Sequence, residues 1–227
     1  MDAGVGGVGA GAGGGAGAGA GGADAGAGGG VGAGVGRAGA GVGGAGAGAG
    51  GGGAVGAGAG GAGPEGWDAA RGAWAGAVTL VTVADGRDDI GVTVSAFCPV
   101  SAEPPLVLVS LMAGSYPAEL FSRPDEPVTR FAVTLLAAGQ RVLAGRFAAS
   151  GRPGARLMLD DVPHRRGPAS GALIPEDGLA ALECSAERLV TAGDHLVVLA
   201  GVTGVPYLTA AGEPLIRFRG RYLPARL

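Results

Sequence analysis

The sequence contains no lysine and no asparagine, and Cys98 and Cys184 are its only cysteines. The two cysteines lie far apart, and neither a Cys-x-x-Cys pair nor a histidine-rich segment accompanies them. This spacing predicts neither a disulfide framework nor a zinc site. We therefore interpret both cysteines as small, buried apolar side chains.

Long runs of bulky apolar residues are also missing. Nominally hydrophobic residues make up 47% of the chain, but only 4% are aromatic and 52 of the 227 residues are glycine. No segment approaches the roughly 18 to 20 bulky apolar residues that span a bilayer as a helix. A net charge of −3, from 19 acidic and 16 basic residues, argues against nucleic acid or an anionic membrane as the main partner. We expect a soluble, cytoplasmic protein.

The first quarter of the chain lacks aromatic side chains, since every Trp, Tyr and Phe lies at or after Trp67. It is almost wholly Gly, Ala and Val, and its only charged residues are Asp2, Asp24 and Arg37. Such a segment has no large side chain to bury, and glycine loses more backbone entropy on ordering than any other residue. It is therefore predicted to be disordered.

This composition divides the chain into two unlike parts. We predict a low-complexity, disordered segment over residues 1–66 and a single folded domain over residues 67–227. Strings such as residues 41–46 satisfy the G-x-G-x-x-G expression of dinucleotide-binding folds, but no strand precedes them and no βαβ unit surrounds them. A signal peptide and a collagen repeat are not supported either, so the segment is a tether or a passenger.

The folded part shows the alternation and turn signals of short strands. Residues 85–88 supply the turn of a hairpin, and the continuous apolarity of residues 106–111 suits a strand buried on both faces. Helices are expected over residues 67–76 and 137–149, and strands over residues 77–83, 90–96, 106–111, 131–136, 179–190, 196–205 and 215–222. Many strands and few helices predict a mainly β protein built as a small antiparallel barrel.

One stretch carries more information than the rest: residues 91–109, GVTVSAFCPVSAEPPLVLV. It resembles the signature of the short-chain flavin reductases, read as G-x-T-V-S-A-F-x-S-V-S-x-D/E-P-P-L-V. Gly193-Asp194-His195 and the residues FRGRY at 218–222 match the same family in the same order. The resemblance covers essentially all of residues 67–227.

This resemblance implies a fold, an activity and partners. The fold would be the FMN-binding split β-barrel, Greek-key-like, with a few short helices. The activity would be hydride transfer from NADH or NADPH to FMN or FAD, with the reduced flavin passing to a separate monooxygenase. The resemblance also implies a homodimer, which is not visible in the residues themselves.

The resemblance assigns the loop after residue 91 to the flavin. Ser95 and Ala96 are small enough for backbone N–H groups to reach the flavin ring, whereas hydroxyl groups are also common at strand ends and turns without any ligand. Cys98 stands where relatives carry Thr, Ser or Asn, so a weak thiol donor replaces a hydroxyl or amide. The implied flavin-contacting residues of this loop are Thr93, Ser95, Ala96, Phe97, Cys98, Val100 and Ser101.

Further cofactor contacts are implied downstream. Ser115 lies in the loop that receives the flavin phosphate in relatives, but the basic residue and the second hydroxyl of that loop are absent here. We therefore expect flavin to exchange rather than to stay bound. Arg146 and Phe147 match a family Arg-Phe near the site, or are simply an outward-facing arginine beside a core phenylalanine.

His195 is the predicted catalytic residue, because the matching histidine of relatives lies at the nicotinamide face of the site. A structural role is the alternative for an isolated histidine. Tyr222 is predicted to shape the same pocket. Arg217, Arg219 and Arg221 alternate along the predicted last strand and would point to one face, toward a dinucleotide phosphate or, as we favour, toward solvent.

Three other functions remain open at the level of sequence. One is a split-barrel oxidoreductase that retains FMN, the second is a flavin- or heme-binding barrel without turnover, and the third is a glycine-rich structural protein. The sequence shows no nucleophile elbow, P-loop, metal-ligand cluster or pair of catalytic carboxylates. Hydride transfer between two cofactors needs none of these motifs, so a sequence without them agrees with the flavin reductase hypothesis.

Overall fold

The computed structural model describes residues 63–86 and 88–225 of the chain. They belong to one compact unit, Gly56–Leu227. The glycine-rich segment up to residue 62 lies outside the described residues, so its disorder stays a prediction. Within the described residues, no helix is long and apolar enough to cross a membrane.

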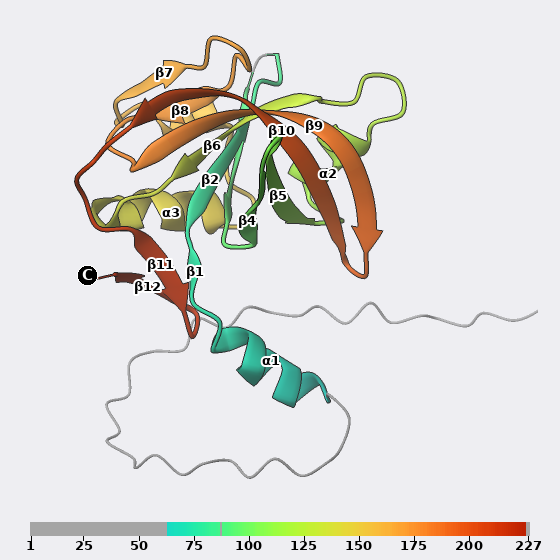
Figure 1. Cartoon of the computed structure of the whole chain (residues 1–227), viewed down its shortest axis with the longest axis vertical. Coiled ribbons are helices and arrows are strands. Elements are labelled where there is room, and N and C mark those ends of the chain that lie inside the picture. Colours follow the sequence, from blue (N-terminus) through green and yellow to red (C-terminus); the bar gives the residue numbers. More distant parts are fainter. Residues whose placement is uncertain (1–62, 87, 226–227) are drawn as a thin grey trace, which may run out of the picture. The chain divides into compact units, whose positions relative to one another are not determined.

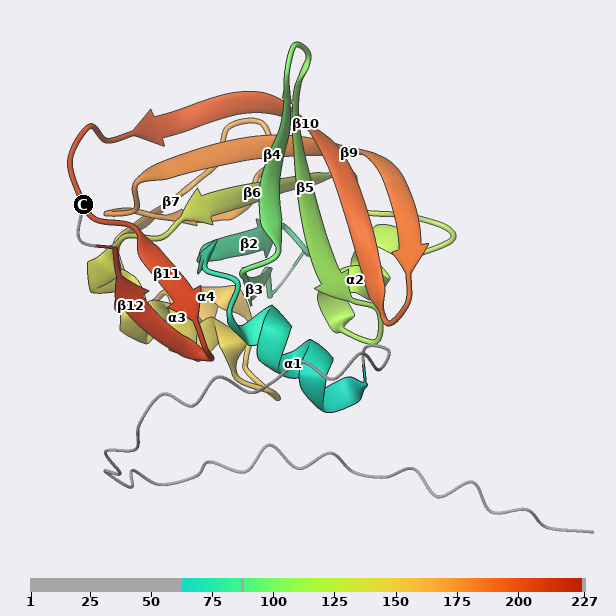
Figure 2. The same cartoon turned by 60° about the horizontal axis from the view of Figure 1, so that its bottom comes forward.

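Within residues 63–86 and 88–225, seven strands form the main sheet, in the order β3-β2-β6-β9-β10-β5-β4. Every neighbouring pair is antiparallel, and Figures 1 and 2 show the sheet curling into a barrel. The strands are β2 (Thr79–Val83), β3 (Ile90–Val94), β4 (Phe97–Ala102), β5 (Pro105–Met112), β6 (Arg130–Leu135), β9 (Ala180–Ala192) and β10 (His195–Leu208). The predicted mainly β split barrel is confirmed, including its first hairpin and its two long strands.

Two smaller sheets lie outside the barrel. One contains β1 (Gly76–Ala77), β11 (Leu215–Phe218) and β12 (Arg221–Pro224), and the other contains β7 (His164–Arg166) and β8 (Leu173–Pro175). Sequence alternation did not predict β7 or β8, because three-residue strands are too short to show a period.

The described part of the chain also contains four short helices: α1 (Pro64–Gly72), α2 (Tyr116–Ser122), α3 (Arg141–Ala148) and α4 (Ala155–Met158). A 3-10 turn, Ala138–Gln140, leads into α3, so the predicted helix over 137–149 is confirmed with a tighter start. The predicted N-terminal helix exists as α1, but it buries no residue. Trp67 is 58% exposed and Trp74, which follows the helix, is 78% exposed, so the apolar residues of this segment do not pack on the barrel.

The main core fills the barrel and is closed by α2, whose Phe121 packs edge-on against Phe131 of β6 with ring centroids 5.2 Å apart. A second core lies between the sheet and α3, and includes Leu80 of β2 and Phe147 of α3. β2 is therefore buried on both faces along its whole length, and β6 is buried on both faces from Phe131 to Thr134.

The prediction that residues 106–111 are buried on both faces is wrong. In β5 only Val107, Val109 and Leu111 are buried, and the residues between them are partly exposed. Helix α3 and strand β8 cover the outer side of β2 and β6, and no described residues cover β5 in the same way.

The predicted single strand over residues 215–222 is also wrong. The chain reverses at Arg219 and Gly220, whose φ angles of 48° and 73° lie in the left-handed region, and it forms the β11–β12 hairpin. In this hairpin Arg217 is opposite Tyr222 and Phe218 is opposite Arg221. The prediction that Arg217, Arg219 and Arg221 alternate along one strand and point to one face is therefore wrong.

A buried carboxylate ties three peripheral segments to the barrel. Asp89, at the end of the β2–β3 turn, is 1% exposed and accepts hydrogen bonds of 2.7 Å from Arg156 Nε and from a terminal nitrogen of Arg166. Burial raises the pKa of Asp89, but the hydrogen bonds from Arg166 and Arg156 outweigh burial and hold the pKa below its ordinary value of 3.8. The turn, α4 and β7 thus share one charged anchor.

We predict that Gly91→Ala destabilises the protein. An added Cβ would overlap the Phe147 ring, which is fully buried and has no room to move. Overpacking of this kind costs about 2 to 3 kcal/mol in the free energy of unfolding. Urea denaturation should show this loss, whereas Gly145→Ala, at an uncrowded helical position, should be neutral or stabilising by up to about 1 kcal/mol. Equal effects of the two substitutions would contradict the packing argument.

We also predict that Asp89→Asn destabilises the protein in a pH-dependent way. Because the native pKa of Asp89 is lowered, its ion pairs stabilise the fold fully above the ordinary pKa and lose this effect as the pH falls through the native pKa. We expect a loss of about 2 kcal/mol at pH 7, since the two arginine side chains remain half exposed. Urea denaturation from pH 7 to pH 2.5 should show wild type and variant converging only at the acidic end.

Candidate functional site

The loop that follows β3 is held in place from both sides. Thr93 Oγ1 donates a 2.8 Å hydrogen bond to the Ala144 carbonyl of α3, so this hydroxyl anchors the strand to the helix behind it. The Ala96 carbonyl accepts a 2.9 Å hydrogen bond from Ser110 N of β5. Ser95 and Ala96 therefore lie at a fixed turn whose side chains are small, with Ser95 half-buried and Ala96 exposed.

The residues after this turn form β4, where a loop was expected. Phe97 is opposite Val109 of β5 and packs on the barrel core, whereas Cys98 and Val100 are exposed and Ser101 is half-buried. β4 ends the sheet order, so among the described residues one side of its backbone has no neighbouring strand. Small exposed side chains and a free strand edge leave backbone groups that a flat ligand can approach.

The exposure of Cys98 corrects one prediction. Only Cys184 is buried, while Cys98 projects outward from the edge strand and its thiol contacts the Pro99 carbonyl at 3.1 Å. Burial, with a smaller effect from the Glu183 charge, raises the pKa of Cys184 to about 12. The two cysteines thus differ strongly in chemical accessibility.

Strand pairing brings Ser115 and His195 to the same end of the barrel. His195 is opposite Met112, and Ala113 N donates a 2.9 Å hydrogen bond to the Asp194 carbonyl. Ser115 Oγ donates a 2.6 Å hydrogen bond to the Met112 carbonyl, which fixes the turn before α2. The loop with Ser115 and the β9–β10 turn therefore form one continuous surface.

His195 has a fixed orientation. Its Nδ1 lies 2.7 Å from Asp194 Oδ1, which leaves Nε2 for another partner. The hydrogen bond from His195 holds the pKa of Asp194 below its usual range, and the nearby charge of Arg71 on α1 adds a smaller effect in the same direction. Asp194 was not predicted as a site residue, although its position next to His195 could have indicated it; no sequence signal connects Arg71 with this turn.

The structure places the other three predicted residues differently. Phe147 is fully buried in the core behind β3, and Tyr222 packs at the edge of the same core. Arg146 faces outward and binds Asp161 with both terminal nitrogens, with one of these contacts at 2.7 Å. Direct contact of these three residues with a ligand stays a prediction, and of the three only Phe147 packs against β3, at Gly91.

The described residues contain no group of His, Cys, Asp and Glu side chains suited to a metal ion. The site instead offers backbone groups at an edge strand, the hydroxyls of Ser101 and Ser115, and one oriented imidazole. This set can bind a flat, polar ligand and place a second ligand beside it.

Comparisons of the sequence with known proteins all point to one family. Residues 71–226 match the family described as "Flavin reductase like domain". The chain is 35% identical over 153 residues to the NADH-dependent FMN reductase AsuE2 of Streptomyces nodosus subsp. asukaensis, covering 67% of this chain and 80% of that protein. It is 34% identical to the reductase component of 4-hydroxyphenylacetate 3-monooxygenase of Thermus thermophilus, covering 70% of this chain and 94% of that protein.

Solved structures give the same fold. The NADH:FAD oxidoreductase SgcE6 of Streptomyces globisporus, in complex with NAD and FAD fragments, superposes with a TM-score of 0.61 at 31% identity, over 68% of this chain and 87% of that one. BorF, the flavin reductase component of a bacterial two-component tryptophan halogenase, has a TM-score of 0.61 at 30% identity, over 70% of this chain and 98% of that one.

The contrast between the two cysteines predicts a labelling result. In the native protein at pH 8, a thiol-reactive chromogenic disulfide should modify one thiol rapidly, because only Cys98 is exposed. Cys98→Ser should abolish that reaction, and unfolding in guanidinium should release the Cys184 thiol. Modification of two thiols, or of none, in the native protein would contradict the placement of these side chains.

Proposed function

The chain belongs to the flavin reductase like family and is an NAD(P)H-dependent flavin oxidoreductase, and from this premise we propose how its own residues serve the reaction. The turn after β3 and strand β4 hold the flavin, and His195 with Asp194 holds the nicotinamide nucleotide. The observation that carries this assignment is the strand pairing that connects both parts of the site to β5.

The two cofactors supply the redox chemistry, since a reduced nicotinamide donates a hydride and a flavin accepts it. The protein is then required to align two rings and to favour the charge of the reduced flavin. The backbone amides of the small Ser95–Ala96 turn and the free edge of β4 suit that task. Thr93 acts as a positioning residue, because its hydroxyl hydrogen is directed to α3.

The phosphate end of the flavin would lie at Ser115. The Ser115 hydroxyl already donates to Met112, so it offers a phosphate only its oxygen lone pairs, and phosphate binding must depend on backbone amides. No arginine lies between Met112 and Leu120. Weak phosphate binding favours a flavin that enters and leaves as a substrate over a flavin that stays bound.

The nicotinamide end is assigned to His195. Asp194 orients the ring and leaves Nε2 free, so Nε2 can hydrogen-bond a carboxamide or phosphate oxygen of the nucleotide. This contact orients the hydride donor and transfers no proton.

A steady-state assay of the full chain with NADH or NADPH, and FMN or FAD, tests this function. We expect colourless protein after gel filtration and oxidation of the nicotinamide only when flavin is added. Flavin that co-elutes in equimolar amount would overturn the exchange proposal. Absence of oxidation in all four pairings would overturn the activity itself.

We predict that His195→Ala raises the KM for the nicotinamide nucleotide about tenfold, as expected for one lost hydrogen bond of about 1.4 kcal/mol, with a much smaller change in the KM for flavin. Thr191→Ala is the matched control, because Thr191 is an exposed residue of the same hairpin and lies opposite Leu196. A His195→Ala variant with unchanged KM for both substrates would show that the imidazole serves the structure alone.

We further propose that the protein works as a cytoplasmic homodimer and delivers reduced flavin to a monooxygenase. Two relatives are named as the reductase component of 4-hydroxyphenylacetate 3-monooxygenase, which supports such a partner. Exposed apolar side chains on the barrel strands, among them Val100, Leu189, Val190 and Val205, give a second copy of the chain a surface to cover. A cytoplasmic location fits the use of NAD(P)H and two unpaired cysteines.

A further inference from the structure

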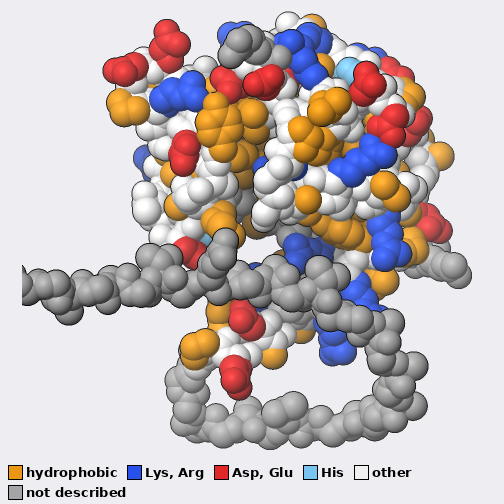
Figure 3. Space-filling view, turned by 180° about the vertical axis from the view of Figure 1, so that it is seen from behind, with side chains coloured by type: hydrophobic (Ala, Val, Ile, Leu, Met, Phe, Trp, Pro, Cys, Tyr) orange, Lys and Arg blue, Asp and Glu red, His pale blue; other side chains and the backbone are white. Residues whose placement is uncertain are grey.

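A cavity of about 500 Å³, open to solvent, lies between α4 and β7. It is lined by Arg156, Asp160, His164, Arg165, Arg166 and Leu173. None of these residues belongs to the flavin and nicotinamide site described above. Figure 3 shows Arg side chains mixed with acidic ones at the top of the folded unit, the end at which Figure 1 places β7.

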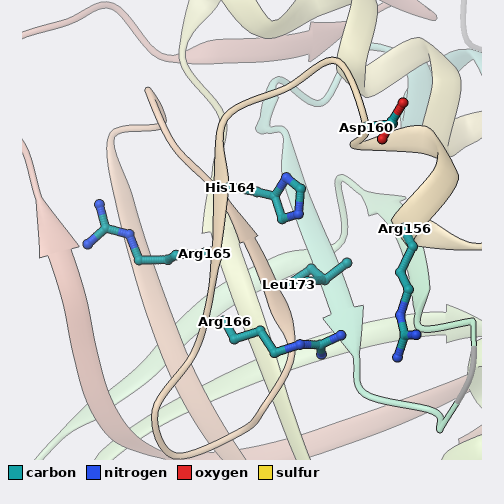
Figure 4. A pocket seen from close by; sticks show the side chains of 6 residues that line it. All are labelled: Arg156, Asp160, His164, Arg165, Arg166 and Leu173. Carbon is teal, nitrogen blue, oxygen red and sulfur yellow. The ribbon is translucent and has the colours of Figure 1, made fainter.

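Two guanidinium groups meet at one side of this cavity. Arg156 reaches in from α4 and Arg166 from β7, and in Figure 4 the end of Arg166 extends toward the guanidinium of Arg156. Both bind the same buried carboxylate, Asp89, so two positive charges face one negative charge. Each is also fixed by a 2.6 Å hydrogen bond to a backbone carbonyl, Arg156 to Gly86 and Arg166 to Gly171.

These bonds leave donors unused. A guanidinium has five N–H groups. The hydrogen bonds of Arg156 occupy Nε and one terminal nitrogen, which leaves its other terminal nitrogen. Those of Arg166 use both terminal nitrogens, toward Asp89 and Gly171, which leaves its Nε and one terminal N–H. Because the side chains are already held, an anion that binds them pays little rotamer entropy. Arg156 and Arg166 are therefore already held in position for an anion, and with Asp89 they carry a net positive charge.

His164 extends the same face. Successive side chains alternate along a strand, so His164 and Arg166 lie on one side of β7 and Arg165 on the other, where it pairs with Glu176 at 3.1 Å and lies over the Tyr207 ring. The Val162 carbonyl accepts a 2.8 Å hydrogen bond from His164 Nδ1, which leaves Nε2 for a ligand. Asp160 is the acidic side chain among the lining residues, and in Figure 4 it lies on the side away from the two guanidiniums.

We propose that this cavity binds a phosphate group, either inorganic phosphate or a phosphate monoester. Arg156 and Arg166 would donate charge-assisted hydrogen bonds to its oxygens and His164 would add a third contact. Planar guanidinium groups match phosphate geometry well. Leu173 gives the cavity one apolar wall, against which the organic part of a monoester can lie.

Isothermal titration of the full chain tests the proposal, at constant ionic strength and without flavin or nicotinamide. The probes are inorganic phosphate and adenosine 5′-monophosphate. We expect one saturable site, binding about tenfold weaker in His164→Ala and about threefold tighter in Asp160→Asn. Both side chains are exposed and neither contributes to the Asp89 ion pairs, so both variants should fold.

Arg188→Ala, which removes an exposed arginine of β9, is the control for general charge effects and should leave the affinity unchanged. Tighter binding of adenosine monophosphate than of inorganic phosphate, with the same dependence on His164, identifies a monoester ligand; the reverse order identifies free phosphate. Absence of saturable binding, or an affinity that neither His164→Ala nor Asp160→Asn changes, overturns the proposal. Because no redox substrate is present, these outcomes are independent of the reductase activity.

Discussion

The geometry of the site depends on the pairing of β5 with its two neighbours. On one side Val109 is opposite Phe97 of β4, and on the other it is opposite Val198 of β10. A shift of either pairing by one residue would turn the buried valines and leucines outward and expose the core. The alternation of β5 therefore fixes the register of β4, which carries the proposed flavin edge, and of β10, which begins at His195. Residues about a hundred positions apart become neighbours because they share this strand.

Close packing behind β3 supplies the second constraint. Gly91 lets the Phe147 ring lie directly against the strand, and the Thr93 hydroxyl bonds to the same helix two residues later. These two contacts hold β3 on α3, so the turn at Ser95 and Ala96 begins from a fixed point. Arg146 and Phe147, which the family resemblance links to the site, lie on the far side of this strand. The packing of Phe147 against Gly91 helps to position the loop, while Arg146 faces outward and pairs with Asp161.

The sequence predicted the elements with a long alternating pattern and the motifs that stay contiguous. It predicted the β2–β3 hairpin, the β9–β10 pair and the split barrel, because each has a clear period or a matched signature. It did not predict the reversal at Arg219 and Gly220, since a two-residue turn inside an apolar and basic run leaves the alternation intact on both sides. The ion pairs of Asp89 were not predicted either, because its arginine partners are 67 and 77 residues away in the sequence. Cys98 was misjudged because cysteine is usually buried, whereas exposure here follows from the edge position of β4, a property of sheet order.

These observations explain why a site of this kind tolerates unusual side chains. At the turn after β3 and along β4, the groups proposed to bind flavin belong to the backbone, and their positions are set by pairing with β5 and by the anchor to α3. A thiol at Cys98 in place of a hydroxyl changes one peripheral donor and leaves those backbone groups where they are. In the loop before α2, the hydrogen bond from Ser115 Oγ to the Met112 carbonyl likewise holds the turn, although neither side chain is charged. Substitutions in side chains should therefore change how long a flavin stays bound more readily than whether it can be placed beside His195, whose ring is oriented by its hydrogen bond with Asp194.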